Sequence, residues 1–457
     1  YLMGKDNFGI SSKYDGDLAY RIVVVRYAML GNRFARYKEV KIATDVSDKT
    51  VAYVNEHMDT LSGISVNEDM IRKYNYSEYF SSIIGYTGPI SESEYTALHK
   101  KNKDYTQNDT VGKAGMEQHY ETYLRGKNGE QKFYIDNVGR ISEIISSTDS
   151  VAGDDLYLSI DADLQKATYL ALQNEIAAIV YSNIKSGEIP INDVYTALIG
   201  NSVINTEHFS KAKASDTEKN VLSVFKSRQK TTLGKIKQEL TSSPEALNTM
   251  SDEVLDEFTY IISMLKDDQV LLKNEIDTSD SVYQKWKNQK ISPKEYLSYC
   301  ITQHWIDISQ LNVDEKYADS TEVYDALCKY ILKNIKTDTE FSKIIYQYMI
   351  TRGESSPRQL CLILFDQGVL DYDDATVNKL KNGSLSPRDF LMKKIYNIEI
   401  TPAQLALEPC TGSCVVTDEK TGEIRAMVSY PGYDSNKLAN GVDSEYFASL
   451  QHDKSSP

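Results

Sequence analysis

The sequence predicts a multidomain α+β protein, because the residue pattern changes twice along the 457-residue chain. Short strand-like runs alternate with short helices first, a long helical stretch follows, and strand patterns return near the end. A chain of this length can hold several domains, each with its own core. The pattern alone divides the chain into three regions, residues 1 to about 150, about 175 to 400, and the part after about 400.

The first domain is expected to be α+β. The run "QKFYIDNVGRISEI" (131–144) carries the β-branched and aromatic residues that favour strands. The run "SESEYTALHKKN" (91–102) favours a helix, because Ser91 can cap its start and Glu94 stands three residues later, as in a capping box.

The stretch 175–400 is predicted to be all helical, since hydroxyl caps recur with apolar stripes behind them. The start signals are Ser292-Pro293 with Glu295, Thr337 with Glu340, Ser243-Pro244 and Ser386-Pro387. Asn382-Gly383 is a stop signal. One stripe at helical spacing consists of Tyr296, Leu297, Cys300, Ile301, His304, Trp305 and Ile308. It places His304 in the core rather than at a metal.

The last domain begins with a predicted hairpin, "SCVVTDEKTGEIRAMVSY" (413–430), which includes Lys420-Thr421-Gly422. A Lys-Thr-Gly also marks the active-site strand of penicillin-recognising serine enzymes. Here the tripeptide lies in a polar stretch that ends in glycine, between two strand-like runs. We therefore predict that it is a turn and not a catalytic strand.

Serine nucleophiles of that class are paired with a lysine in Ser-x-x-Lys, one helical turn apart. The spacing occurs five times, at Ser182/Lys185, Ser210/Lys213, Ser223/Lys226, Ser227/Lys230 and Ser263/Lys266. All five lie in the lysine-rich helical stretch, where such a short pattern arises easily by chance. The Ser-x-Asn that must follow the nucleophile is found only upstream, at Ser65-Val66-Asn67. We predict solvated helix faces and no catalytic residue. The alternative, an independent serine hydrolase, requires a serine at the base of a cleft with a desolvated lysine.

Composition and motif content narrow the kinds of partner and binding site that the chain can have. A net charge of −15 argues against nucleic acid or an anionic membrane surface as a direct partner. No apolar run is long enough to span a bilayer. Neither nucleotide-binding glycine motifs nor metal-ligand spacings occur among the histidines and five cysteines, so we predict no cofactor and no metal.

Several motifs in order resemble the class B penicillin-binding proteins. The run "DEKTGEIRAMVSYPGYDSN" (418–436) resembles the opening strands of their transpeptidase domain, and "LYLSIDADLQKATYLAL" (156–172) resembles its first helix. The run "VGKAGMEQHYETYLRGKNG" (111–129) is similar to a motif of their pedestal, or dimerisation, domain, and "GYTGPIS" (85–91) also has a family counterpart.

The resemblance implies an α+β pedestal (1–152), the first segment of a transpeptidase domain (153–174), a helical insertion (175–400) and the first strands of the transpeptidase domain (401–457). The sequence departs from the pattern of this family in three ways. The membrane anchor and first pedestal motif are missing, Asn75 replaces a frequent proline, and the chain stops at "HDKSSP" before the expected catalytic Ser-x-x-Lys. The site residues that it implies are structural ones, namely Arg72, Gly112, Gly115, Glu117, Asp161, Asp163 and Gln165. We expect ion pairs from the four charged residues and backbone turns at the glycines.

The function implied is that of a non-catalytic portion of a peptidoglycan D,D-transpeptidase, on the extracytoplasmic face of a cell membrane with a single-pass anchor. Peptidoglycan stem peptides and β-lactams are the expected partners of the complete protein. A glycosyltransferase or a division or elongation protein is a further expected partner. The alternative is a non-enzymatic module whose helical insertion docks such a protein, which predicts an exposed apolar patch on those helices.

Overall fold

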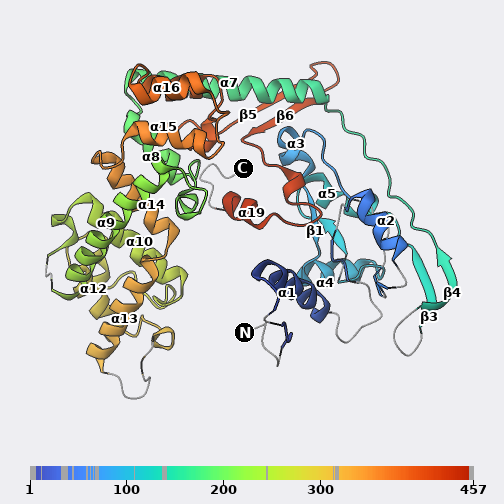
Figure 1. Ribbon diagram of the computed structural model, residues 1–457, viewed down its shortest axis with the longest axis horizontal. Coiled ribbons are helices and arrows are strands. Elements are labelled where there is room, and N and C mark those ends of the chain that lie inside the picture. Colours follow the sequence, from blue (N-terminus) through green and yellow to red (C-terminus); the bar gives the residue numbers. More distant parts are fainter. Residues whose placement is uncertain are drawn as a thin grey trace. The chain divides into compact units, whose positions relative to one another are not determined.

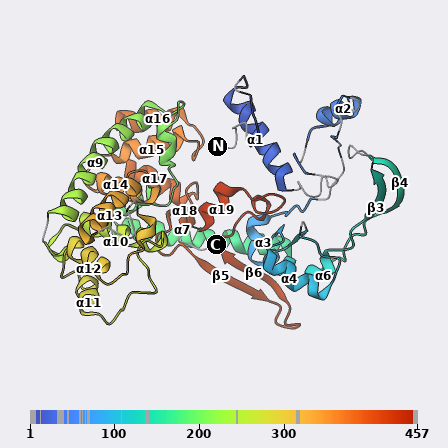
Figure 2. The same ribbon diagram turned by 90° about the horizontal axis from the view of Figure 1, so that it is seen from below.

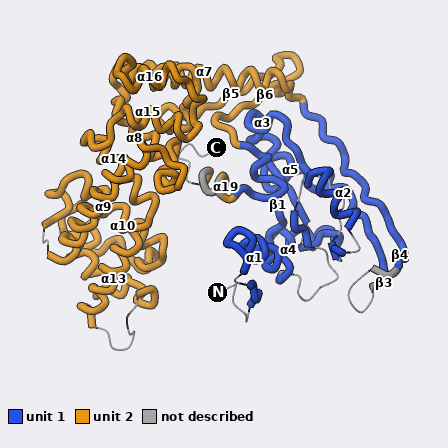
Figure 3. The backbone as a smooth tube through the Cα atoms, in the orientation of Figure 1, with its two compact units in different colours: residues 1–158, 434–443 blue, residues 159–433, 444–457 orange. Residues whose placement is uncertain are grey.

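The computed structural model describes residues 7–451, apart from 12, 32–39, 44–45, 58–59, 62, 65, 67–70, 108, 136–140, 243–244, 312 and 314–318. The chain forms two compact units (Figure 3). Unit 1 consists of Tyr1–Leu158 and Asp434–Asp443, and unit 2 of Ser159–Tyr433 and Ser444–Pro457. The chain therefore enters unit 1 a second time, for ten residues, late in the sequence.

Unit 1 combines short helices with two small antiparallel sheets (Figure 1). Its helices are α1 (Gly16–Gly31), α2 (Asp48–Glu56), α3 (Ser77–Ile84), α4 (Glu92–Lys101), α5 (Gly115–His119), α6 (Glu121–Leu124) and the 3₁₀ turn η4 (Ser435–Lys437). Its strands are β1 (Thr87–Pro89), β2 (Thr110–Gly112), β3 (Glu130–Ile135) and β4 (Ile141–Thr148). Strand β1 pairs with β2, and β3 pairs with β4 in the predicted 131–144 hairpin.

In unit 2 a long helix lies on a hairpin (Figure 2). The helix is α7 (Ala162–Ser186), and the antiparallel strands are β5 (Gly412–Thr417) and β6 (Ile424–Tyr430). The second half of α7 packs instead against α17 (Pro387–Tyr396). The predicted domain boundary between 174 and 175 therefore falls inside one continuous helix.

The rest of unit 2 is a helical bundle, called here the helical region (191–405). Its longer helices are α8 (Ile191–Gly200), α9 (Asp216–Thr241), α10 (Asp252–Asp267), α12 (Pro293–Thr302), α13 (Ser320–Ile335), α14 (Thr339–Thr351), α15 (Pro357–Asp366) and α17. Shorter ones are η1 (Thr206–Ser210), η2 (Leu247–Thr249), α11 (Ser281–Lys287), η3 (Ile308–Gln310), α16 (Asp374–Asn382) and α18 (Pro402–Leu405). A last helix of unit 2, α19 (Ser444–Gln451), lies beyond this region. Apolar side chains with almost no exposed surface fill the interior, such as Phe258, Leu265 and Leu364.

Most of the predicted helix ends are confirmed. Ser91 and Glu94 form a capping box, Ser292 and Ser386 cap α12 and α17, and Gly383 ends α16 with a left-handed φ of 81°. Ser243-Pro244 lies outside the described residues.

Two predictions in this stretch are wrong. Helix α14 is capped by Asp338, whose carboxylate accepts the Phe341 N–H, and not by Thr337. Helix α12 ends at Thr302, so His304 lies beyond it, exposed and with a φ of 59°. The apolar spacing continues past the helix because Trp305 and Ile306 are buried as well, where their segment pairs with the chain at Leu271.

Among the described residues, no helix has the length and apolar character needed to cross a bilayer.

Candidate functional site

An ion pair joins two predicted site residues of unit 1. Arg72 lies in an extended segment before α3, and Glu117 is in the middle of α5. The guanidinium Nε is 2.8 Å from one oxygen of Glu117, and an Nη is 3.0 Å from the other. Two parallel bonds of this kind fix the orientation of both groups. Glu117 is only 5% exposed, so this pairing offsets the cost of burying its charge.

The predicted glycines allow backbone to meet backbone around this pair. A Cβ on Gly112 would lie 2.1 Å from the carbonyl group of Glu117, so only glycine lets β2 contact α5. Gly115 has a φ of +57°, and a Cβ there would lie 2.4 Å from the Ile83 carbonyl oxygen at the end of α3. Gly85 makes the reciprocal approach to Ala114. Helices α3 and α5 thus pack through their main chains.

The late segment of unit 1, residues 434–443, binds the backbone beside this pair. The Asn440 side chain accepts a hydrogen bond from the Arg72 N–H (3.0 Å) and donates one to the Arg72 carbonyl oxygen (2.7 Å). Asn436 does the same with Tyr74, at 2.8 and 3.0 Å. Each side-chain amide thus pairs with the N–H and the carbonyl oxygen of one residue, as the backbone of a neighbouring β-strand would. We call Asn436 and Asn440 the asparagine clamp.

A third contact holds the beginning of the same segment. The Ser77 hydroxyl donates a hydrogen bond to the Asp434 carboxylate (2.5 Å) and accepts one from the Ser435 N–H (3.0 Å). Burial alone would raise the pKa of Asp434, but the hydrogen bonds from the Ser77 hydroxyl and the Asn436 N–H outweigh it and lower the pKa. Asp434 therefore stays ionised and fixes η4 against α3.

In unit 2, Gln165 connects α7 to the hairpin. Its amide accepts from the Met427 N–H (2.8 Å) and donates to the Met427 carbonyl oxygen (2.9 Å), and Gln165 has no exposed surface. Asp161 caps α7 by accepting the Leu164 N–H, while Asp163 lies exposed in the first turn. Neither aspartate takes part in the ion pairs found between described residues.

Comparison with known proteins finds a family match over most of unit 1. Residues 10–158 match a family model described as the penicillin-binding protein dimerisation domain. The resemblance to the class B penicillin-binding proteins is confirmed. The matched range ends at the residue where the first segment of unit 1 ends.

Individual relatives match about a third of the chain. Peptidoglycan D,D-transpeptidase MrdA of Salmonella typhimurium (strain LT2) is 28% identical over 157 residues, 34% of this chain and 25% of that protein. Penicillin-binding protein 2A of Bacillus subtilis is 34% identical over 136 residues, 29% of this chain and 19% of that protein. A solved structure of penicillin-binding protein 2B from Streptococcus pneumoniae covers 39% of this chain and 28% of its own, at 24% identity and a TM-score of 0.26. The chain spans about a quarter or less of the length of these two curated relatives.

The Lys-Thr-Gly of this chain is a turn, as predicted. Asp418 accepts the N–H groups of Lys420 and Thr421, and Gly422 has a φ of 76° between β5 and β6. The five candidate serines are all exposed on the helical surface, with none at the base of a cleft. The pair Ser65/Asn67 lies outside the described residues. The geometry required by an independent serine hydrolase is therefore absent from the described helices.

Sequence reasoning did not identify Asn436, Asn440 or Ser77 as site residues. Asparagine is typical of turns, so its i, i+4 repeat after "YPGYD" carried no distinctive signal. The contacts also join positions 357 to 368 residues apart, which no local pattern can show.

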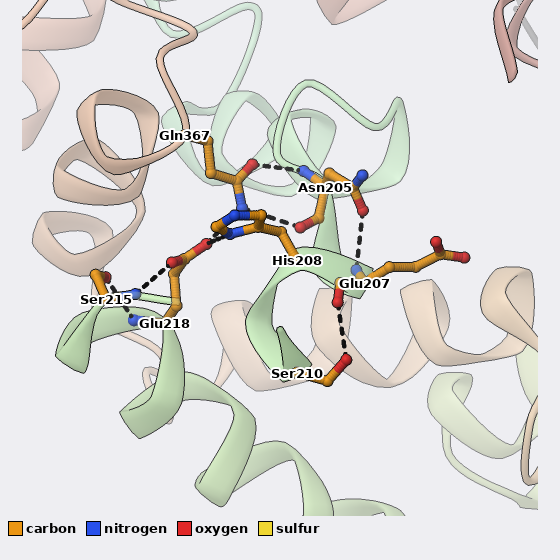
Figure 4. A network of polar contacts seen from close by, with 7 residues as sticks. All are labelled: Asn205, Glu207, His208, Ser210, Ser215, Glu218 and Gln367. Atoms are coloured by element: carbon orange, nitrogen blue, oxygen red, sulfur yellow. Dashed lines mark hydrogen bonds and ion pairs between the residues drawn. The ribbon is translucent and has the colours of Figure 1, made fainter. Parts of the chain in front are cut away.

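The same amide pairing recurs inside the helical region (Figure 4). Gln367 accepts the Asn205 N–H and donates to the Asn205 carbonyl oxygen, at 2.8 and 2.9 Å. Its amide also donates to buried Glu218, which His208 contacts at 2.7 Å. Burial raises the pKa of Glu218, but the bonds from Gln367, the Ser215 N–H and His208 lower it overall. This network holds η1, α9 and the end of α15 together.

Proposed function

We propose that this chain is a non-catalytic portion of a penicillin-binding protein that cross-links peptidoglycan by serine acyl transfer. In this proposal, 1–152 is the pedestal and 153–174 with 401–457 is the start of the transpeptidase domain. Residues 175–400 are then an insertion. The whole protein would be anchored in a cell membrane, with these parts on the extracytoplasmic face. Its substrates would be peptidoglycan stem peptides, and β-lactams would acylate its serine.

The asparagine clamp is the observation that carries this proposal. The segment that it holds begins at Asp434, which three residues separate from the end of β6, the strand that resembles the opening of the transpeptidase domain. By the family pattern, the nucleophile follows soon after this segment. Fixing 434–443 on the pedestal would therefore fix the start of the catalytic region. Precise placement of reacting groups supplies much of an enzyme's rate, and an error of about 1 Å can cost ~100-fold.

The test is acylation by a penicillin, followed by intact mass. The chain as given should gain no adduct, and a polypeptide extended past Pro457 into the expected Ser-x-x-Lys should gain one penicilloyl group. A double variant of the extended protein, N436A/N440A, should be acylated about 10- to 100-fold more slowly, because the catalytic segment loses its fixed position. The matched control is Asn397→Ala, which removes an exposed asparagine of the helical region.

Two results would overturn the proposal. An adduct on the chain as given would mean that one of the five surface serines is reactive. An extended protein that folds but gains no adduct would remove the acyl-transfer function altogether.

The docking alternative receives little support from the helical surface. The large apolar side chains exposed on the described part of the proposed insertion, 175–400, are Ile179, Tyr372 and Tyr396. Three such side chains are too few for the large apolar patch that a stable protein interface needs.

A further inference from the structure

The helical region contains a cluster of charged side chains, two of them buried glutamates of α10, where α9, α10 and the end of α14 meet. Glu253 of α10 accepts two hydrogen bonds from Arg228 of α9, at 2.7 and 2.9 Å, and one from Arg352 after α14, at 2.5 Å. Glu354 adds a carboxylate 3.7 Å from Arg228. In charge, the two arginines balance Glu253 and Glu354.

Glu257 is the member of this cluster that takes part in none of the ion pairs found between described residues. It lies one turn after Glu253 on the same face of α10, and only 1% of its surface is exposed. Its Oε2 atom has no hydrogen-bond partner among the described residues. Lys235 of α9 acts on it electrostatically, but Lys235 is exposed, so water screens its charge. Ionised Glu257 would therefore add a buried negative charge that no described ion pair offsets.

We propose that Glu257 is a proton-binding site, occupied in the folded helical region at neutral pH and emptied as the medium becomes alkaline. A neutral Glu257 carboxyl adds no charge to the cluster, whereas an ionised one places a second buried negative charge beside Glu253. Loss of the proton thus weakens the junction of α9, α10 and α14. This inference does not depend on the proposed function, because it concerns the stability of the helical region alone.

The electrostatics of the site point the same way. Burial, followed by the negative charge of Glu253, raises the pKa of Glu257 to about 8, against the opposing effects of Lys235, Arg228 and Arg352. The unfolded chain has an ordinary glutamate, with a pKa of about 4.3. Between these two values the folded state holds one more proton than the unfolded state. Stability therefore falls as the pH rises through this window and levels off above the folded pKa.

The chain carries a built-in reporter for this effect. Its two tryptophans, Trp286 and Trp305, both lie in the helical region, so tryptophan fluorescence follows the unfolding of that region. We would measure urea unfolding of the full chain at closely spaced pH values from about 5.5 to 9. The unfolding constant of the wild type, divided by that of Glu257→Gln, should rise up to tenfold per pH unit and become constant above about pH 8.

A matched control separates this site from general effects of charge. Asp252→Asn removes a carboxylate from the same helix, but Asp252 is exposed, so this variant should keep the wild-type pH dependence. Parallel curves for the wild type and Glu257→Gln would overturn the proposal.

A direct titration covers the case in which Glu257→Gln does not fold. In protein labelled with ¹³C-glutamate, the Glu257 carboxyl resonance of the wild type should titrate near pH 8. A midpoint near the ordinary glutamate value would reject the proton site without any variant.

Discussion

Unit 1 and the helical region differ in how their segments are held together. Unit 1 has few buried apolar side chains among its described residues, and the helical region has many. In the described part of unit 1 they are Ala19, Tyr74, Phe80, Ile83, Tyr105, Val111, Leu438 and Ala439. The helical region instead contains a continuous interior of leucine, isoleucine and phenylalanine from each of its longer helices. Apolar burial, at about 25 cal/mol per Å², is therefore the main stabilising term of the helical region.

Unit 1 uses directional contacts where it lacks apolar ones. Its segments meet through close main-chain approaches at glycine, through the Arg72–Glu117 pair and through the asparagine clamp. Such contacts fix geometry strongly but contribute little net free energy each, about 0.5–1.5 kcal/mol per hydrogen bond. The difference suggests that the helical region is built for stability and unit 1 for the exact placement of a few chain segments.

The largest effect is expected from removing a core side chain of the helical region. Phe341 of α14 has no exposed surface and packs against Tyr260. Phe341→Ala should lower the free energy of unfolding by about 3–5 kcal/mol, because it removes apolar contacts and leaves a cavity. Urea unfolding followed by tryptophan fluorescence measures this loss.

The matched control for this core position is Phe341→Leu. Leucine keeps most of the volume, so it should cost less than about 1.5 kcal/mol. A loss below 1 kcal/mol in Phe341→Ala would mean that apolar burial is not what holds this region.

An intermediate effect is expected from adding a methyl group to unit 1. Gly115→Ala places a Cβ 2.4 Å from the Ile83 carbonyl oxygen at a φ of +57°. Backbone strain and forced separation of α3 from α5 should together cost about 2–4 kcal/mol. Hydrogen exchange of peptides covering 83–90 and 110–119 would report the loss of protection.

Gly63 provides the matched control for this clash. It also has a positive φ, of +84°, but a Cβ there meets nothing within 4 Å. Gly63→Ala should therefore cost only the strain, about 1 kcal/mol. Equal effects at both glycines would show that the close approach of α3 and α5 does not matter.

The sequence predicted those features that depend on neighbouring residues. The capping box of Ser91 and Glu94, the caps at Ser292 and Ser386 and the turn at Asp418–Gly422 all follow from residues within five positions of one another. The cap of α14 was misplaced by one position, because Thr337 and Asp338 are adjacent and both suit a cap.

Features that depend on distant residues could not be predicted. Arg72 and Glu117 were each singled out, but no local pattern pairs two residues that lie 45 positions apart. Asp161 was expected in an ion pair and is instead the cap of α7, a role that its place before "ADLQ" already suits. The asparagine clamp and the charge cluster around Glu257 required the three-dimensional structure.

The smallest effect tests whether the two regions differ in packing alone. Ser91 caps α4 in unit 1 and Ser356 caps α15 in the helical region, and each belongs to a complete capping box. Because a cap acts through the first turn of its own helix, Ser91→Ala and Ser356→Ala should each cost about 1 kcal/mol. Hydrogen exchange of α4 and tryptophan-monitored unfolding measure the two losses, and Ser→Thr at each position should restore most of the stability. If Ser91→Ala costs far more than Ser356→Ala, local contacts in unit 1 are coupled to its distant ones, and the contrast between the two regions lies in cooperativity rather than in core size.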